Sequence, residues 1–216
     1  MGALLSVDAV HIAPHKAINM DAIGADMLFC SAYKFFGGHI GIAAVQKSVF
    51  EALDTYRLHP APSTAPGKLE TGTQSHEAIA SIVPAVDFIA GLGTGSTRRE
   101  RLVSGFERIE RHENGLADII RQGLADVPGL KLYQSEGPKT ATVAFTLEGR
   151  QPGDVCRKLC DRYGIFAADG DYYAETLAHR VGVDRIGGWV RVGFAPYHTE
   201  EEAELLVRAV HEIAAG

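Results

Sequence analysis

A single lysine, Lys34, ends an apolar run and leads into two aromatic residues and paired glycines, in the stretch CSAYKFFGGHIGIAAV (30–45). It is either an ordinary surface charge at the end of a strand or an amine held in place for chemistry. An amine is a nucleophile only when it is deprotonated, and an apolar environment lowers the pKa of a lysine toward neutrality. Other residues of the chain distinguish these two interpretations.

A carboxylate, Asp8, lies in the apolar run ALLSVDAVHI (3–12). The run is aliphatic and contains β-branched residues, so we expect a strand that is covered on both faces. A charged group in such a strand is costly without a partner. Asp8 is therefore a functional carboxylate, which we favour, or a strand-end aspartate that accepts a hydrogen bond from a backbone amide.

Two further residues are candidates for binding an anion. Thr73, in ETGT (70–73), precedes a predicted helix. It is either part of an anion site at the helix N-terminus or a simple helix cap. Arg191 lies in the apolar stretch WVRVGFAP (189–196). It is either a surface arginine or one that binds a carboxylate through two parallel hydrogen bonds.

The elements that must position these residues alternate between strands and helices. We expect strands at 3–12, 26–32 and 40–46, a short helical or turn segment at 18–25, and helices at 47–56, 75–93 and 96–127. In the remainder we expect strands at 130–134, 140–147, 164–168 and 188–194, and helices at 152–163, 174–182 and 199–215. Thr199 and Glu202 form a capping box for the last helix.

Composition narrows the function classes. The 216 residues are 46% hydrophobic, with a net charge of −6 and no run of basic residues, so we expect neither a nucleic-acid partner nor binding to anionic lipid. No apolar stretch approaches the roughly 20 residues of a membrane span, and the first residues do not resemble a signal peptide. We therefore expect a cytoplasmic protein.

The three cysteines are an odd number, which argues against a disulfide framework. Cys156 and Cys160 are four residues apart on a predicted helix, and no further Cys or His follows at zinc-site spacing. We expect them, and Cys30 in its strand, to pack in the interior rather than to bind metal. A metal or redox role for the helical pair is the alternative.

The chain begins in a strand that reads as central, and only two more strands of that sheet follow. Three strands would leave a long apolar edge unpaired. The sequence is therefore interpreted as the second half of a larger protein.

Four blocks in order, VDAVHIAPH, SAYKFFG, ETGTQSHEAIA and VRVGFAPYHTEEEAELL, resemble the class V aminotransferase family of fold-type I pyridoxal-phosphate enzymes, and within it the cysteine desulfurase-like proteins. The resemblance covers nearly the whole chain but only the C-terminal half of such an enzyme. It implies an α/β fold. Residues 1–95 would be part of the cofactor-binding large domain, with a mainly parallel sheet and helices, and 96–216 a linking helix and a small C-terminal α+β domain.

The resemblance also implies catalytic roles. Lys34 matches the lysine that forms a Schiff base with pyridoxal 5'-phosphate and moves the proton on the α-carbon of an amino-acid substrate. Asp8 matches the carboxylate beside the protonated ring nitrogen of the cofactor. His11 matches a residue near its phenolic oxygen, although an ordinary loop histidine is the alternative.

Other matches concern binding. Ser31 and Tyr33 fall where the family donates hydrogen bonds to the cofactor phosphate, with Tyr33 in place of a histidine. Thr73 matches a threonine that reaches the phosphate of the neighbouring subunit, which implies a homodimer, and Arg191 matches the arginine that binds the substrate α-carboxylate. Gly38 replaces a proline found in many relatives, so we expect a looser turn there.

Two departures limit what the resemblance implies. The stretch 168–190 lacks the nucleophilic cysteine of the desulfurases, so we expect a different lyase, racemase or transaminase step, with Asp169, Tyr172 and Tyr173 at the mouth of the site. The half that would supply a ring stacked on the cofactor and a second phosphate loop is missing. This chain alone should therefore bind the cofactor weakly or not at all.

Two hypotheses remain. The chain is a pyridoxal-phosphate enzyme acting on an amino acid, or the lysine-bearing part of one. Alternatively, it is a truncated non-catalytic fragment or binding module that keeps the fold without turnover.

Overall fold

The computed structural model describes residues 2–216. The chain divides into two compact units, the first ending at Arg108 and the second comprising Ile109–Gly216. Helix α4 (Arg98–Leu124) contributes residues to both units. Helices and sheets are present in each unit, so the predicted α/β class is confirmed.

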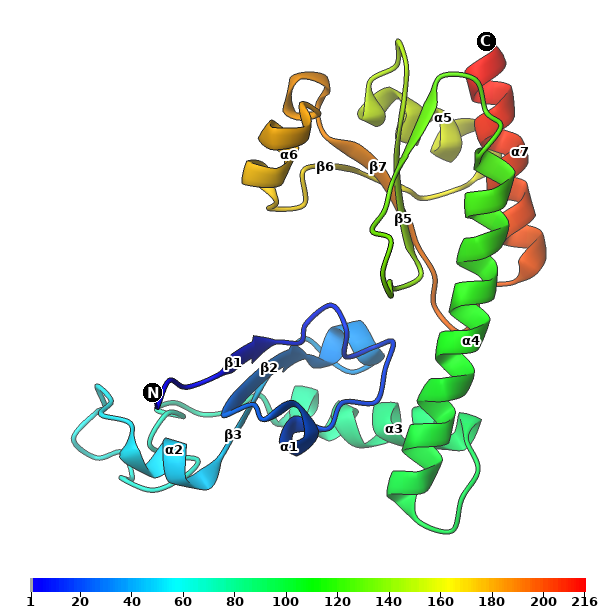
Figure 1. Ribbon diagram of the computed structural model, residues 1–216. Coiled ribbons are helices and arrows are strands. Elements are labelled where there is room, and N and C mark those ends of the chain that lie inside the picture. The colour runs from blue at the N-terminus through cyan, green and yellow to red at the C-terminus, as the bar shows by residue number, and fades with distance from the viewer. Residues whose placement is uncertain (1) are drawn as a thin grey trace. The chain divides into compact units, whose positions relative to one another are not determined.

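The first unit is built on a three-stranded sheet, in the order β1 (Ser6–Asp8), β2 (Met27–Ser31) and β3 (Gly41–Val45). β1 runs parallel to β2, and β3 runs antiparallel to β2. The helices of this unit are α1 (Met20–Ile23), the 3-10 helix η1 (Ala32–Phe35), α2 (Lys47–Ala52) and α3 (His76–Leu92). Figure 1 shows α3 running beside the sheet.

Strand β1 is not covered on both faces, so that expectation was wrong. Leu4 and Leu5 are 55% and 43% exposed, and Asp8 is also exposed. β1 is an edge strand that pairs only with β2, and no element within residues 2–216 covers its Asp8 face. The second layer that a buried strand requires is not provided by the described part of the chain.

The second unit contains a four-stranded antiparallel sheet in the order β4-β5-β7-β6. Its strands are β4 (Leu130–Tyr133), β5 (Thr142–Leu147), β6 (Ala168–Gly170) and β7 (Trp189–Gly193), and its helices are α5 (Pro152–Tyr163), α6 (Glu175–Val181), the 3-10 helix η2 (Asp184–Ile186) and α7 (Glu200–Ala215). The capping box of Thr199 and Glu202 at α7 is confirmed. β6 begins at Ala168, where the strand predicted at 164–168 was expected to end.

The two faces of this sheet pack differently. One face forms the main core with α4, α5 and α7, and this core includes the fully buried Phe145, Leu159 and Ile213. The other face carries a smaller cluster around Trp189, which includes Ala178 of α6. Because side chains alternate along a strand, Val190 of β7 belongs to the first face and Trp189 to the second.

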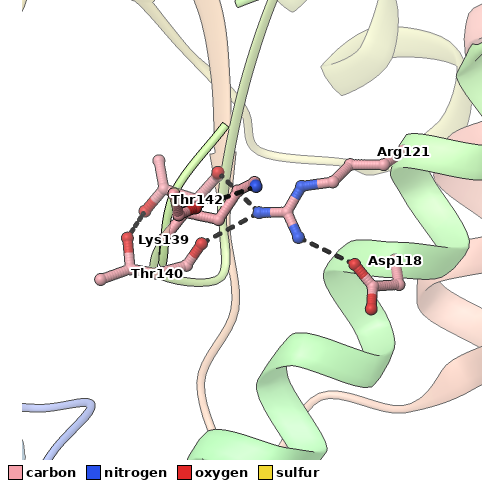
Figure 2. A network of polar contacts seen from close by, with 6 residues as sticks. Asp118, Arg121, Lys139, Thr140 and Thr142 are labelled. Atoms are coloured by element: carbon pink, nitrogen blue, oxygen red, sulfur yellow. Dashed lines mark hydrogen bonds and ion pairs between the residues drawn. The ribbon is translucent and has the colours of Figure 1, made fainter. Parts of the chain in front are cut away.

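Arg121 fastens α4 to the segment that leads into β5 (Figure 2). Its guanidinium donates to Asp118 at 2.9 Å and to the carbonyl oxygens of Thr140 and Thr142 at 3.0 and 3.4 Å. The Arg121 side chain is only 12% exposed. These bonds satisfy two backbone acceptors that precede and begin β5.

Candidate active site

Lys34 lies on η1, directly after the central strand β2 of the first unit. The buried Phe35 anchors this turn, and Phe36, which has a left-handed backbone (φ 74°), ends it. Gly37 closes the turn by donating its N–H to the carbonyl of Ala32 at 2.9 Å. The side chain of Lys34 is exposed, so residues 2–216 do not provide the apolar environment expected around its amine.

Gly38 fastens the lysine turn to α3. Its N–H donates to Oγ of Ser81 at 2.6 Å, and that hydroxyl donates to the carbonyl of Ala78 at 2.6 Å. A Cβ at Gly38 would lie 2.6 Å from the Ser81 Oγ and 3.1 Å from the Ala78 Cα. The expected loosening was therefore wrong, because the glycine allows a close approach and a hydrogen bond that proline lacks the N–H to make.

β1 and β2 run parallel, so their carboxyl ends lie at the same end of the sheet (Figure 1). Asp8 ends β1, and Ser31 ends β2 three residues before Lys34. Ligands of α/β proteins bind beyond the carboxyl ends of parallel strands, which is where these residues lie. An amine, a carboxylate and a hydroxyl thus share one sheet edge.

Asp8 makes the local hydrogen bond that the sequence left open. Its Oδ1 accepts from the backbone N–H of Val10 at 2.9 Å. Within residues 2–216, Oδ2 accepts no hydrogen bond, and the residue is exposed. The argument that Asp8 is buried and needs a partner was therefore wrong for this chain, but its second oxygen is available to a ligand.

Two histidines accompany these residues. His11 follows β1, is exposed, and stacks edge-on against His15 with ring centroids 5.5 Å apart. His39 was not singled out from the sequence, yet its ring packs 4.8 Å from that of Tyr33, beside Lys34. Since Tyr33 replaces a histidine of the resembled motif, His39 returns an imidazole to the same turn. Its place five residues after Lys34 gave no signal of this contact.

Thr73 lies in the segment before α3 and is exposed. The cap of α3 is Ser75, whose Oγ accepts from the N–H of Ala78 at 3.4 Å. Thr73 is therefore not the helix cap. A hollow of about 890 Å³ lies nearby, between β3, α2 and residues 64–74, but none of the predicted site residues lines it.

Arg191 lies on β7 of the second unit, on the same face as Trp189. Its guanidinium carbon is 3.7 Å from the centroid of the Tyr172 ring. Of the residues expected at the mouth of the site, Tyr172 thus contacts Arg191, Asp169 lies exposed on β6, and Tyr173 is fully exposed. Sequence reasoning had not paired Tyr172 with Arg191.

Two of the three cysteines, Cys156 and Cys30, lack the surroundings of a nucleophile. Cys156 is 8% exposed, and burial, together with the charge of Asp169, raises the pKa of its thiol to about 11. Burial also raises the pKa of Cys30.

In the described part of the chain there is no group of three or more His, Cys, Asp or Glu residues that could hold a metal ion. No helix within residues 2–216 is long and apolar enough to cross a membrane.

Comparison with known proteins shows the family to which the chain is similar. A family model described as aminotransferase class-V matches residues 1–206. A probable cysteine desulfurase of Mycobacterium leprae is 30% identical over 230 residues, which cover 100% of this chain and 34% of that protein. An uncharacterized protein of Mycobacterium tuberculosis is 27% identical over 213 residues, covering 97% of this chain and 52% of that one.

A solved structure shares the fold. The apo cysteine desulfurase of Thermococcus onnurineus superposes with a TM-score of 0.87 at 23% identity, covering 100% of this chain and 53% of that one. The chain thus spans about a third to a half of the length of the curated relatives it matches.

Proposed function

Because this chain belongs to the class V aminotransferase family, whose members depend on pyridoxal phosphate, we propose that it is the lysine-bearing part of an enzyme that uses this cofactor on an amino acid. The observation that carries the proposal is the set Asp8, Ser31 and Lys34 at one carboxyl edge of the sheet. An amine, a carboxylate and hydroxyl donors are the groups that such a cofactor requires.

We assign the residues at this end of the sheet to different parts of the cofactor. Lys34 would supply the amine that holds the cofactor through its aldehyde carbon, and the same amine would move a proton at the substrate α-carbon. Asp8 offers its Oδ2 to the ring nitrogen, and its bond to Val10 fixes the orientation of the carboxylate. Ser31 and Tyr33 donate hydroxyl hydrogen bonds to the phosphate. When bound, the cofactor supplies an electron sink for bonds at the α-carbon.

Substrate and partner follow from the remaining residues. Arg191 binds the α-carboxylate of an amino acid, since its planar fork matches that group. His11 would lie near the phenolic oxygen of the cofactor. Thr73, which is exposed and does not cap α3, donates to the phosphate bound by a second copy of the chain, so the working unit is a homodimer.

The reaction we propose does not run through a cysteine persulfide on this chain. The stretch 168–190 contains no cysteine. Cys156, with a pKa raised to about 11, remains a thiol at neutral pH. We therefore favour a lyase, racemase or transaminase step on an amino acid.

A second candidate is a fragment that keeps the fold without turnover. It is favoured by the exposure of both Lys34 and Asp8, because a cofactor held there has protein on fewer sides. In that case the cofactor binds weakly, and no stable visible band forms when the purified chain is mixed with it. A stable band that borohydride abolishes, and that Lys34→Ala lacks, would contradict weak binding.

Reductive labelling tests the lysine assignment even where binding is weak. The chain is mixed with excess pyridoxal phosphate and borohydride, and the labelled peptides are identified by mass spectrometry. Label should concentrate on Lys34, and Lys47→Ala, which removes an exposed lysine of α2, should leave that label unchanged. Label spread evenly over surface lysines would refute the assignment.

A further inference from the structure

The guanidinium of Arg191 lies over the ring of Tyr172. The Arg191 Cζ lies 3.7 Å from the centroid of the Tyr172 ring, so the guanidinium is stacked on the face of the ring. Within residues 2–216, no hydrogen bond or ion pair engages the Arg191 side chain, which is half-buried. A half-buried guanidinium in this state has its N–H donors available to an anion.

The ring of Tyr172 is fixed independently of Arg191. Its hydroxyl donates to the carbonyl of Ala168 at 2.5 Å and lies 3.3 Å from the carbonyl oxygen of Trp189, so it contacts both β6 and β7. Tyr172 also packs against the Trp189 cluster. Burial raises the pKa of the phenol, which keeps it a neutral donor to these carbonyls. Arg191 thus contacts a ring whose position is fixed by contacts with both β6 and β7.

The backbone around this tyrosine has an uncommon conformation. Tyr172 and Tyr173 are consecutive residues with positive φ angles of 56° and 62°. Non-glycine residues rarely adopt this region, so a pair of them must be stabilised by its surroundings. Asp171 contributes by accepting the N–H of Tyr173 at 3.0 Å through its Oδ1. The loop therefore presents the ring of Tyr172 to Arg191 at a conformational cost.

We propose that Tyr172 is a positioning residue, which holds the guanidinium of Arg191 in the orientation that receives the carboxylate of an amino acid. This inference rests on the carboxylate role proposed for Arg191. Stacking occupies a face of the guanidinium, whereas a carboxylate binds in its plane through two parallel N–H···O bonds. Arg191 can make both contacts at once. Stacking on Tyr172 already restricts the rotamers of Arg191, so binding of the carboxylate has less side-chain entropy to lose.

The proposal makes the ring, not only the charge, a determinant of affinity. Stacking of arginine on an aromatic face is worth about 0.5–2 kcal/mol. Loss of the ring should therefore weaken carboxylate binding by roughly two- to thirtyfold. Tyr173 provides a matched control, because it is the adjacent tyrosine on the same loop and is fully exposed, whereas the ring that Arg191 contacts is that of Tyr172.

The experiment measures binding of L-alanine to the full chain without cofactor. The Nε–H resonance of Arg191 in ¹⁵N-labelled protein is followed during the titration. In the free wild type, the ring current of Tyr172 should shift this proton upfield. Tyr172→Leu should lose that shift and bind L-alanine at least about twofold more weakly. Tyr172→Phe should keep the shift and most of the affinity, and Tyr173→Leu should match the wild type.

The variants distinguish failure of the positioning role of Tyr172 from failure of the carboxylate role of Arg191. If Arg191→Met abolishes binding while Tyr172→Leu binds as tightly as wild type or more tightly, the positioning role is overturned and the carboxylate role stands. If Arg191→Met binds L-alanine like the wild type, both fail. Should Tyr172→Leu not fold, as judged by Trp189 fluorescence, the wild-type spectrum still decides: an unshifted Nε–H proton shows that the stacking is absent and overturns the inference.

Discussion

Cys156 is the residue whose surroundings most clearly limit its chemistry. A thiol reacts as its thiolate, and the pKa of Cys156 is raised to about 11 by burial and by the charge of Asp169. At pH 8 its thiolate fraction is about a hundredfold smaller than that of an unperturbed cysteine. We predict correspondingly slow alkylation by iodoacetamide, measured by mass spectrometry on Cys160→Ala protein. The reverse variant, Cys156→Ala, reports the half-buried Cys160 as the control; fast labelling of Cys156 would contradict its burial.

The same thiol makes stability depend on alkaline pH. In the folded chain the pKa of Cys156 is about 11, whereas a cysteine in the unfolded chain has its ordinary pKa of 9.0. Between these values the native state binds more protons than the unfolded state, so the free energy of unfolding falls as pH rises. We predict that the urea midpoint falls more between pH 9 and 11 in wild type than in Cys156→Ala. Equal slopes in the two proteins would exclude this contribution.

For single residues, the sequence predicted their place in the fold better than their exposure and their contacts. The order of motifs placed Asp8 and Lys34 at the ends of β1 and β2, and the parallel pairing brings those ends to one edge. Their exposure was not predicted, since burial depends on a layer that residues 2–216 do not contain. The partner of Arg191 was missed because Tyr172 is 19 positions away and its loop conformation is not encoded in strand periodicity.

At the scale of elements, the turn after Lys34 depends on the absence of a side chain at Gly38. A Cβ there would lie 2.6 Å from Ser81 Oγ and 3.1 Å from Ala78 Cα, so α3 or the turn must move. We predict that Gly38→Ala lowers the free energy of unfolding by about 1–3 kcal/mol, as overpacking does. Gly41→Ala, with nothing within 4 Å of the added Cβ, should change it by less than about 0.5 kcal/mol. Urea unfolding compares the two, and equal effects would show that the approach to α3 is unimportant.

Arg121 provides the second element-scale test, since it holds the segment before β5 against α4 (Figure 2). Arg121→Met keeps most of the apolar stem but leaves the carbonyls of Thr140 and Thr142 without this donor. We predict a loss of about 1–3 kcal/mol in the free energy of unfolding. Arg157→Met removes a similar ion pair to Asp154 between side chains that are 70% and 57% exposed, so it should cost under about 1 kcal/mol. Comparable losses in both variants would argue against a special role for Arg121.

Elements with strong periodicity were the ones predicted well. The long helix expected at 96–127 is α4 (Arg98–Leu124), and the one expected at 152–163 is α5 (Pro152–Tyr163). The 3-10 helix that carries Lys34 was missed, because four residues are too short to show a helical period. The strand expected at 3–12 shrank to Ser6–Asp8, since an apolar run extends pairing only where a neighbouring strand is present.

At the scale of the whole molecule, the two units differ in how much apolar surface they bury. Of the buried hydrophobic residues in the described chain, 8 precede Ile109 and 23 lie from Ile109 onward, and five of the 8 are alanines. Burial of large apolar side chains is the main stabilising term in folding. The first unit, which carries Lys34, should therefore be the less stable of the two. This agrees with a chain that spans about a third to a half of its relatives' length.

Hydrogen exchange measures this difference directly. Amides exchange through local opening when the free energy of that opening is smaller than that of global unfolding. We predict that β2 exchanges at least about tenfold faster than β5, although each is hydrogen-bonded to a strand on both sides. Because we expect weak cofactor binding, excess pyridoxal phosphate should leave the exchange of β2 nearly unchanged. Equal protection of Leu28 in β2 and Phe145 in β5 would show that the first unit is as stable as the second, and that its exposed face needs no further layer to hold the lysine in place.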